Sequence, residues 1–467
     1  MTFFLQAPRS LVVSDSQVTL PCVYLTRSRY LPSQCESVET QPTMSVSIIG
    51  AGLGGLTLGC ALKARGIPCT IFERSRPGPR NGYSITLFEK QILGLDKPDL
   101  QSLPFLLGID RAAFRSAVAV DEGIGGAGRL HESTIDSYSK GDEQARPFRA
   151  HRATVESLLG RNLEIRWDAK VSGIRPAEGQ KTELVFENGS NVVSDYIVAA
   201  DGVHSSVRKN LLPDLDPTAL PFVVFNGKRR MSKEVYDRVY APAMSGATTL
   251  DMLTDGNVRL QLALNEIKGD RIGLSYTYSR PARADDTLHR PDRGVHEATN
   301  IPEEFYKEVS QLHSLPPAFS EAFNVENMKE DRLLHWLMRV SNVEEAAANS
   351  MDERLPKLAV QGIYFMGDAI HSQPILGGYG GNLAIQDALQ LAEELDHRIK
   401  RQDTSDSQPA LQQARDFYSR RIALWIESTK NALNNIYKLH DQSGPSAEDM
   451  EKLASQSESS SSSRTKI

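Results

Sequence analysis

Short apolar runs alternate with helix-like patterns of apolar and polar positions along most of this 467-residue chain. Near its start, Ser45–Ile49 is rich in β-branched residues, as expected of a buried parallel strand. A glycine-rich turn leads into the apolar stretch Leu56–Leu62, which fits a helix, and Cys69–Phe72 reads as a second strand. Asp195–Ala200 and Gly362–Met366 read as two more buried strands. This alternation of strands and helices predicts an α/β architecture.

A different pattern fills residues 211–354, where four segments have the composition of strands: Phe222–Phe225, Thr248–Leu253, Val258–Ala263 and Arg271–Tyr278. Apolar and polar residues alternate within Val258–Ala263, which predicts a sheet with one buried face. We therefore expect residues 211–354 to form an inserted β-sheet lobe that roofs a substrate pocket. Tyr276 and Tyr278 share one face of their strand. They are either wall residues of that pocket or ordinary strand tyrosines.

Helical patterns dominate the C-terminal part of the chain. Leu383–Leu395 is amphipathic, and apolar residues recur at helical spacing within 411–439. We expect a discontinuous α/β domain formed by 44–210 and 355–400, followed by a C-terminal helical segment at 401–443. The two ends lack such patterns, so 1–43 is expected to be a disordered leader and the serine-rich 444–467 a disordered tail.

The turn after the first predicted strand carries a dinucleotide-binding fingerprint. Gly50, Gly52 and Gly55 satisfy Gly-x-Gly-x-x-Gly between a strand and a helix, which is the context that gives the pattern meaning. The first glycine permits the tight turn, the second lets a pyrophosphate approach, and the third lets helix and strand pack closely. Glu73 closes the second strand, where an acid accepts hydrogen bonds from ribose hydroxyls. The alternative, a glycine-rich turn beside a surface glutamate, does not explain this complete order of features.

A second match to the same glycine spacing, at Gly123–Gly128, has the wrong surroundings. The polar segment Arg129–Ser133 follows it and cannot open a buried helix. We expect a glycine-rich hairpin loop there. The sequence therefore predicts no second Rossmann half for a nicotinamide cofactor.

Two further predicted strands end in turns that pair an aspartate with a glycine: Asp201-Gly202 and Gly367-Asp368. Parallel α/β sheets bind ligands beyond the carboxyl ends of their strands, so both turns are expected to border the nucleotide site. A helix is predicted to begin shortly after the second turn, at Gly380, Gly381 and Asn382. The free amides of its first turn can meet an anionic edge of a bound ligand.

Taken together, the three turns give the chain a resemblance to a known family. The fingerprint, the Asp-Gly turn with Ser205 and Arg208 behind it, and the Gly-Asp turn occur in the order seen in FAD-dependent monooxygenases of the p-hydroxybenzoate hydroxylase type. The resemblance extends from about Met44 to Leu395. The chain departs from the family at 82–85, where Gly-Tyr-Ser-Ile replaces the Gly-x-Gly-Ile of many members. The backbone expected near the flavin is less defined there.

The resemblance implies a cofactor, an electron donor and roles for individual residues. FAD would be the bound cofactor, and NADPH or NADH would donate electrons without a dedicated domain. Glu73 would bind the adenosine ribose, Arg152 would contact FAD, and Asp368 would hold the ribityl chain or the pyrophosphate. Asp201 and Arg208 resemble positions that are tied to both FAD binding and reduced-nicotinamide binding. Pro374 and the turn at 377–382 would border the isoalloxazine ring.

The implied reaction is monooxygenation, in which reduced flavin and O2 form a C4a-hydroperoxide that hydroxylates or epoxidises a small substrate. The family suggests an aromatic or polycyclic substrate, with secondary metabolism as its setting. The sequence offers two candidates for a catalytic role, His371 and Tyr276. His371, just after the Gly-Asp turn, is expected to be a positioning residue rather than a proton shuttle. Alternatives on the same fold are a halogenase, a dehydrogenase or a non-catalytic FAD-binding regulator. The halogenase Trp-x-Trp-x-Ile-Pro signature is missing.

The amino-acid composition limits the kinds of partner that the chain is expected to bind. With 53 Lys+Arg against 59 Asp+Glu, the net charge of −6 argues against a nucleic-acid-binding protein. No apolar stretch approaches the ~18 residues that a membrane helix needs. Four cysteines without a CxxC pair offer neither a disulfide scaffold nor a zinc site and favour a reducing compartment. We expect a cytoplasmic enzyme acting on a small organic molecule and O2, with an organelle-targeting leader in 1–43 as an alternative and the oligomeric state left open.

Overall fold

The structure, a computed structural model, describes residues 44–78, 83–88, 147–244, 248–376, 380–401 and 408–440. The predicted leader, the loop expected at 123–128 and the serine-rich tail lie outside the described residues.

Five parallel strands form a sheet in the order β17-β9-β1-β2-β5. They are β1 (Val46–Ile49), β2 (Cys69–Phe72), β5 (Glu164–Arg166), β9 (Tyr196–Ala199) and β17 (Ile363–Phe365). All four residues of β1 are buried, as expected for a central strand that is covered on both faces. Because β17 pairs with β9, chain segments from before and after the inserted lobe meet inside one sheet.

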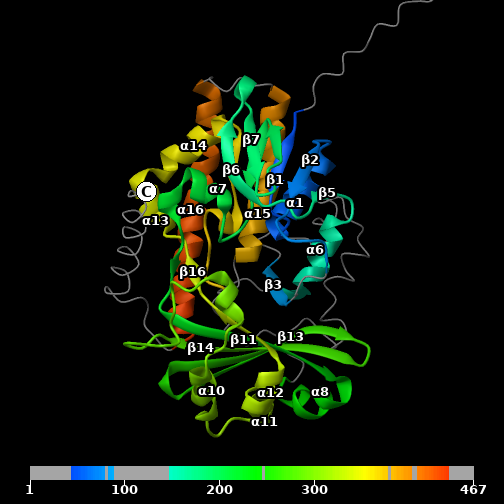
Figure 1. Cartoon of the computed structure of the whole chain (residues 1–467), viewed down its shortest axis with the longest axis vertical. Helices are drawn as coiled ribbons and strands as arrows, with labels where there is room; N and C mark the ends of the chain where they lie inside the picture. Colours follow the sequence, from blue (N-terminus) through cyan, green and yellow to red (C-terminus); the bar gives the residue numbers. More distant parts are fainter. Residues whose placement is uncertain are drawn as a thin grey trace, which may run out of the picture. The chain divides into compact units, whose positions relative to one another are not determined.

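Helices cover this parallel sheet (Figure 1). They are α1 (Leu53–Ala64), α6 (Arg152–Gly160), α7 (Ser206–Leu211), α13 (Val343–Ala346), α14 (Asp352–Val360), α15 (Gly380–Arg401) and α16 (Gln408–Lys438). α1 packs on α15, and α14 packs on α16. Three small antiparallel pairings complete the region: β6 (Val171–Pro176) with β7 (Thr182–Phe186) and β8 (Asn191–Ser194), β3 (Ser84–Phe88) with β4 (Pro147–His151), and β10 (Thr218–Ala219) with β16 (Arg339–Val340).

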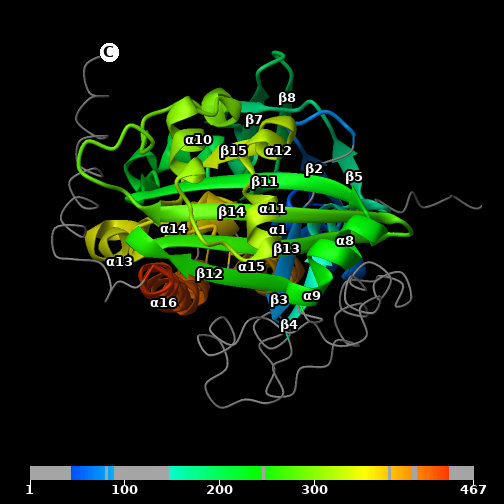
Figure 2. The same cartoon turned by 90° about the horizontal axis from the view of Figure 1, so that it is seen from below.

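The inserted lobe contains a five-stranded antiparallel sheet in the order β12-β13-β14-β11-β15 (Figure 2). Its strands are β12 (Thr249–Thr254), β13 (Val258–Lys268), β14 (Arg271–Pro281), β11 (Phe222–Ser232) and β15 (Arg332–Trp336). Helices α8 (Lys233–Val239), α9 (Ala241–Met244), α10 (Glu303–Ser310), α11 (Pro317–Ala322) and α12 (Val325–Glu330) supply apolar side chains to one core with this sheet. The predicted α/β class, with a Rossmann-like domain, an inserted sheet and a C-terminal helix, is confirmed.

The prediction that this sheet buries only one face is wrong. In Val258–Ala263 every residue except Gln261 is buried. Leu260 and Leu262 pack in the core with the helices, whereas Arg259 and Ala263 lie on the opposite surface and are buried as well. The second surface is buried because β3 and α16 reach it. The backbone amide and hydroxyl of Ser84 bond Asn265, and the α16 end places the His440 ring on the Ser279 hydroxyl.

No helix within the described ranges is long and apolar enough to cross a membrane.

Candidate functional site

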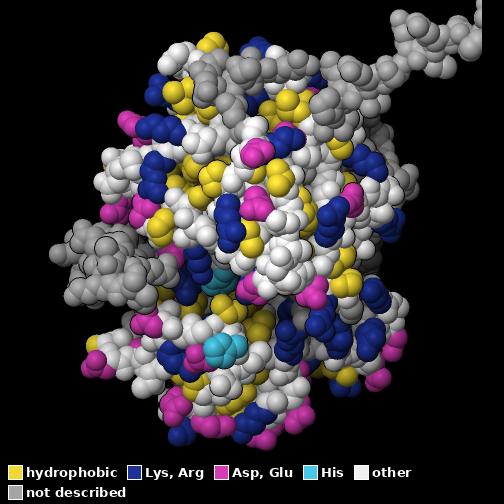
Figure 3. Space-filling view, turned by 45° about the horizontal axis from the view of Figure 1, so that its top comes forward, with side chains coloured by type: hydrophobic (Ala, Val, Ile, Leu, Met, Phe, Trp, Pro, Cys, Tyr) yellow, Lys and Arg dark blue, Asp and Glu magenta, His cyan; other side chains and the backbone are white. Residues whose placement is uncertain are grey.

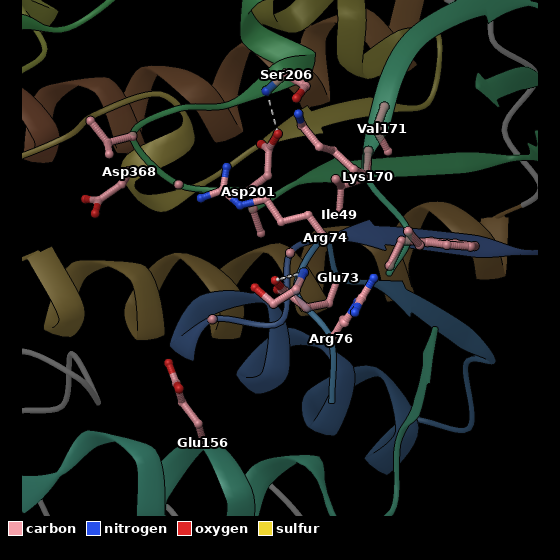
Figure 4. Close-up of a pocket in the computed structure, with 18 of the residues that line it drawn as sticks. Ile49, Glu73, Arg74, Arg76, Glu156, Lys170, Val171, Asp201, Ser206 and Asp368 are labelled. Carbon is pink, nitrogen blue, oxygen red and sulfur yellow. Dashed lines mark hydrogen bonds between the residues drawn. The ribbon is translucent and has the colours of Figure 1, made fainter. Parts of the chain in front are cut away.

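A cavity of about 620 Å³ opens at the carboxyl ends of β1, β2 and β9, a size typical of small-molecule and cofactor sites. Residues from all three predicted turns line it (Figure 4). The lining includes seven of the predicted site residues: Gly50, Gly52, Glu73, Arg152, Asp201, Gly202 and Asp368. Three turns that are distant in sequence therefore meet at one site.

The glycine turn has the geometry that its sequence predicts. Gly50 has φ +106°, which side-chain-bearing residues rarely adopt. A Cβ on Gly55 would stand 2.0 Å from the Gly50 carbonyl oxygen, so no larger residue fits where α1 crosses β1. Gly52 is the N-cap of α1, has no side-chain cap and lines the cavity. The first amides of α1 thus lack a side-chain acceptor at the position where an anion binds a helix N-terminus.

Glu73 holds the cavity wall in place. Its Oε2 accepts a hydrogen bond from the backbone amide of Ala51 at 2.8 Å, and its Oε1 accepts one from Ser75 at 2.9 Å. The carboxylate therefore joins the glycine turn to the segment after β2.

Asp201 presents an unpaired acceptor. Its Oδ2 accepts a hydrogen bond from the Ser206 amide at 2.7 Å, whereas its buried Oδ1 has no hydrogen-bond partner. Burial raises the pKa of Asp201 above its ordinary value, although hydrogen bonds from Ser205 and Ser206 oppose that rise. An orphaned acceptor in a cavity wall is the kind of group that a bound ligand satisfies.

Arg208 is fully buried and ties the two aspartate turns together. Its guanidinium donates to the carbonyl oxygens of Val203 and Ala369, each at 2.7 Å, and pairs with Asp216 at 3.2 Å. Val203 belongs to the Asp201 turn, and Ala369 follows Asp368. Arg208 is not among the cavity-lining residues, so its place in the structure is behind the site.

The start of α15 lies beside Asp368 of the third turn, although no α15 residue is among those that line the cavity. A Cβ on Gly380 would lie 3.5 Å from Oδ1 of Asp368, and a Cβ on Gly381 would lie 3.6 Å from Leu53 of α1. The Asn382 amide donates to the carbonyl oxygen of Thr86 in β3 at 3.1 Å. Burial raises the pKa of Asp368, partly offset by the nearby positive charges. The predicted ring-bordering residues 377–379 lie outside the described residues, while Gly367 and Pro374 are buried.

His371 lies behind the third turn rather than in the cavity. Its Nε2 contacts Oδ2 of Asp387, an α15 residue that also accepts the Gly367 amide at 2.8 Å. Trp425 of α16 stacks on the His371 ring at 4.6 Å and donates to the other Asp387 oxygen at 3.1 Å, where Arg421 is also paired. This geometry agrees with a positioning role for His371.

Sequence reasoning missed Asp387 and Tyr83. Asp387 stood in the middle of an amphipathic helix, where an acid usually faces solvent. Tyr83 lines the cavity, and its hydroxyl accepts a hydrogen bond from Arg152 Nη1 at 2.8 Å. The only signal for Tyr83 was its place in the altered segment 82–85.

Tyr276 and Tyr278 face away from the cofactor cavity. Both side chains lie in the core that the sheet shares with α8–α12. Tyr276 donates to Asp331 at 2.9 Å, and Tyr278 donates to Glu308 at 2.8 Å. Burial, together with the Asp331 carboxylate, raises the pKa of Tyr276, so its phenol stays protonated. The idea that these tyrosines form the pocket wall is corrected: they are structural.

Comparison with known proteins places the chain in a family. Residues 326–414 match a family described as FAD binding domain, and residues 48–82 match an NAD(P)-binding Rossmann-like domain. The FAD-dependent monooxygenase aptC of Emericella nidulans is 30% identical over 419 residues, which cover 85% of this chain and 96% of that protein. The chain belongs to the FAD-dependent monooxygenases. A second FAD-dependent monooxygenase, vrtH of Penicillium aethiopicum, is 32% identical over 362 residues, which cover 75% of this chain and 84% of that protein.

Solved structures share the fold of this monooxygenase. HpxO of Klebsiella pneumoniae, complexed with FAD and uric acid, matches with a TM-score of 0.57 and 16% identity over 91% of this chain and 94% of that chain. PqsL of P. aeruginosa, in complex with 2-aminobenzoylacetate, matches with a TM-score of 0.57 and 16% identity over 88% and 99%. The cavity, the open α1 amides and the orphaned Asp201 oxygen fit FAD, the cofactor of the family.

Proposed function

We propose that this monooxygenase takes electrons from NADPH or NADH and inserts one atom of O2 into a small aromatic or polycyclic substrate of secondary metabolism, as a hydroxyl or an epoxide. The observation that carries the proposal is the convergence of the Gly52, Asp201 and Asp368 turns on one cavity. A simple nicotinamide dehydrogenase would need only the first of these turns, so that function does not explain why the other two line the same cavity.

Residue roles follow from the geometry. The uncapped amides of α1 would bind the FAD pyrophosphate, and Glu73 would bind the adenosine ribose. Asp201, through its unpaired oxygen, and Asp368, beside the start of α15, would accept hydrogen bonds from the hydroxyl-bearing part of FAD. Arg152, which is bonded to Glu156 and Tyr83 and lies beside Gly52, would contact the cofactor near the start of α1.

When bound, FAD supplies hydride acceptance and oxygen activation, and the protein supplies orientation and water exclusion. The N-terminus of α15 would stabilise negative charge on the edge of the ring. The buried Arg208 and Asp387 contacts hold the second and third turns in register, so that the cavity keeps one shape.

The experiment measures FAD content by absorbance, then NADPH and NADH oxidation with O2 uptake across phenolic and polyketide-like compounds. We expect one compound to stimulate oxidation and to gain one ¹⁸O atom from ¹⁸O2. Asp368→Asn should lose most bound FAD, whereas Asp352→Asn, on the exposed side of α14, should retain it. A FAD-loaded protein without stimulated oxidation on any compound would contradict the proposal.

A further inference from the structure

Tyr83 lines the cofactor cavity, yet its ring is in contact with the inserted lobe. The Nζ of Lys228, on β11, lies 5.5 Å from the centre of the Tyr83 ring, and the Trp336 ring, on β15, lies 6.2 Å from it. None of the described lobe residues, 211–244 and 248–354, is among those that line the cavity. Tyr83 therefore connects the inserted lobe to the cavity wall.

The residue after Tyr83 is bonded to the same lobe. The Ser84 amide donates to Asn265 Oδ1 at 3.0 Å, and the Ser84 hydroxyl donates to the Asn265 carbonyl oxygen at 2.6 Å. Asn265 is the extra residue of a bulge in β13, a feature that changes the direction of a side chain. Ser84 stands at the second glycine of the Gly-x-Gly-Ile pattern, and a glycine could not form the hydroxyl bond.

On the cofactor side, two of the three Arg152 side-chain nitrogens are bonded. Nε donates to Glu156 at 2.9 Å, and Nη1 donates to the Tyr83 hydroxyl at 2.8 Å. Nη2 has no hydrogen-bond partner among the described residues, and it would lie 3.9 Å from a Cβ on Gly52. Because a guanidinium is planar and rigid, the two bonds determine where Nη2 points. That direction is the glycine turn, where a pyrophosphate approaches.

Two cations lie over the Tyr83 ring. The guanidinium carbon of Arg152 is 5.6 Å from the ring centre, and Lys228 is on the lobe side. Burial and nearby arginines, chiefly Arg332, lower the pKa of Lys228 to about 8, so its ammonium is still mostly charged at pH 7. Cations at this distance are attracted to an aromatic ring. Figure 3 shows Lys and Arg side chains beside the hollow between the lobe and the rest of the molecule.

We propose that Tyr83 is a positioning residue for the cofactor: Lys228 holds its ring, and its hydroxyl holds Arg152 so that Nη2 donates to the FAD pyrophosphate. This inference rests on the proposed function, because it concerns the cofactor of the same enzyme. It implies that the inserted lobe contributes to FAD affinity although it does not line the cavity. The order of action runs from Lys228 through Tyr83 to Arg152.

The first test measures the FAD Kd by fluorescence titration of FAD-depleted, full-length enzyme. We expect Tyr83→Phe to weaken FAD binding by about tenfold, the equivalent of one hydrogen bond to a charged donor. Arg152→Met should weaken it at least as much. Adding Tyr83→Phe to Arg152→Met should change the Kd by less than about twofold, because the hydroxyl acts through the guanidinium. A full Tyr83→Phe effect without Arg152 overturns this step.

The second test asks whether the lobe acts through Tyr83. Lys228→Met should weaken FAD binding by about threefold in the wild type and leave the Kd unchanged in Tyr83→Phe, whereas Lys228→Arg should retain affinity. The matched control is Arg230→Met, which removes the same charge two residues along β11, where Arg230 is exposed and pairs with Glu266. Its Kd should stay within about twofold of the wild type. Equal losses in Lys228→Met and Arg230→Met overturn the inference, because they show a general loss of positive charge.

The double variants also separate positioning from a merely structural role. A structural Tyr83 would give losses of FAD affinity that add in both double variants, and that result overturns the inference. Wild-type affinity in Tyr83→Phe overturns it as well, while the enzyme still holds FAD and the proposed function stands. Wild-type protein that binds no FAD contradicts the proposed function before any variant is compared.

Discussion

Gly55 is the tightest packing point of the fingerprint, because any Cβ there meets the Gly50 carbonyl oxygen. We expect Gly55→Ala to lower the free energy of unfolding by about 1–3 kcal/mol, as overpacking does, and to weaken FAD binding at least about tenfold. FAD absorbance and urea unfolding measure both effects. Gly173→Ala is the control, since its Cβ would meet nothing closer than 4.0 Å. Full FAD content in Gly55→Ala would contradict the role given to this turn.

Tyr276 was a candidate for a catalytic role because of its side-chain chemistry, but its position places it in the core of the inserted lobe. Tyr276→Phe removes one hydrogen bond to Asp331, so it should lower the free energy of unfolding by about 1 kcal/mol. The substrate-stimulated rate should stay unchanged, because the ring packs edge-on against Phe323, just after α11, on the helix side of the sheet. A large fall in that rate with unchanged stability would return Tyr276 to the active site.

Helix α16 acts on the cofactor turn through two side chains. Arg421 and Trp425 hold Asp387, which holds the Gly367 amide. Arg421→Met would leave a buried carboxylate without its cation, so we expect a loss of about 3–5 kcal/mol in unfolding free energy together with weaker FAD binding. Arg420→Met, one residue away and exposed, serves as the control and should change little. Unchanged FAD affinity in Arg421→Met would show that α16 does not support the turn.

The ion pair between Arg280 of β14 and Asp286, in the loop after that strand, makes the inserted lobe sensitive to acid. Burial alone would raise the pKa of Asp286, but hydrogen bonds from Arg280 and two backbone amides lower it to about 2. A carboxyl with a lowered folded pKa contributes stability that is present above about pH 4 and lost as pH falls towards 2. Asp286→Asn should therefore cost about 2 kcal/mol at pH 7 and progressively less below pH 4, as measured by urea unfolding. The exposed Asp285→Asn should show no such pH-dependent difference.

The elements differ in how far the sequence predicts them, for physical reasons. β1 and β9 are buried on both faces, so their apolar runs were recognisable. β11 was predicted only as far as Phe225, because Asn226 and the charged residues after it interrupt the apolar run although the strand continues to Ser232. The glycine and aspartate turns were predictable because local geometry demands those residue types. Asp387 was not, because its partners come from a helix that only tertiary packing brings near.

FAD binding should stabilise the folded chain as a unit, since segments from both sides of the inserted lobe line its cavity. At FAD concentrations about 100 times Kd, linkage adds about 2.7 kcal/mol, which corresponds to a rise in Tm of roughly 3–6 °C. Scanning calorimetry of FAD-depleted protein with added FAD measures this rise. Flavin mononucleotide lacks the adenosine half that Glu73 and the glycine turn would bind, so its effect should be smaller. Equal shifts would contradict the assigned orientation.

The pairing of β17 with β9 has a consequence for synthesis. β9 leaves the ribosome well before β17, and the entire inserted lobe emerges between them. Until β17 arrives, β9 is an edge strand with unpaired backbone groups, which is a template for association with other chains. Nascent chains that contain β9 but not yet β17 therefore expose an edge strand that can associate with other chains. Their need for chaperones should be greatest just before Asp368 and α15 are translated.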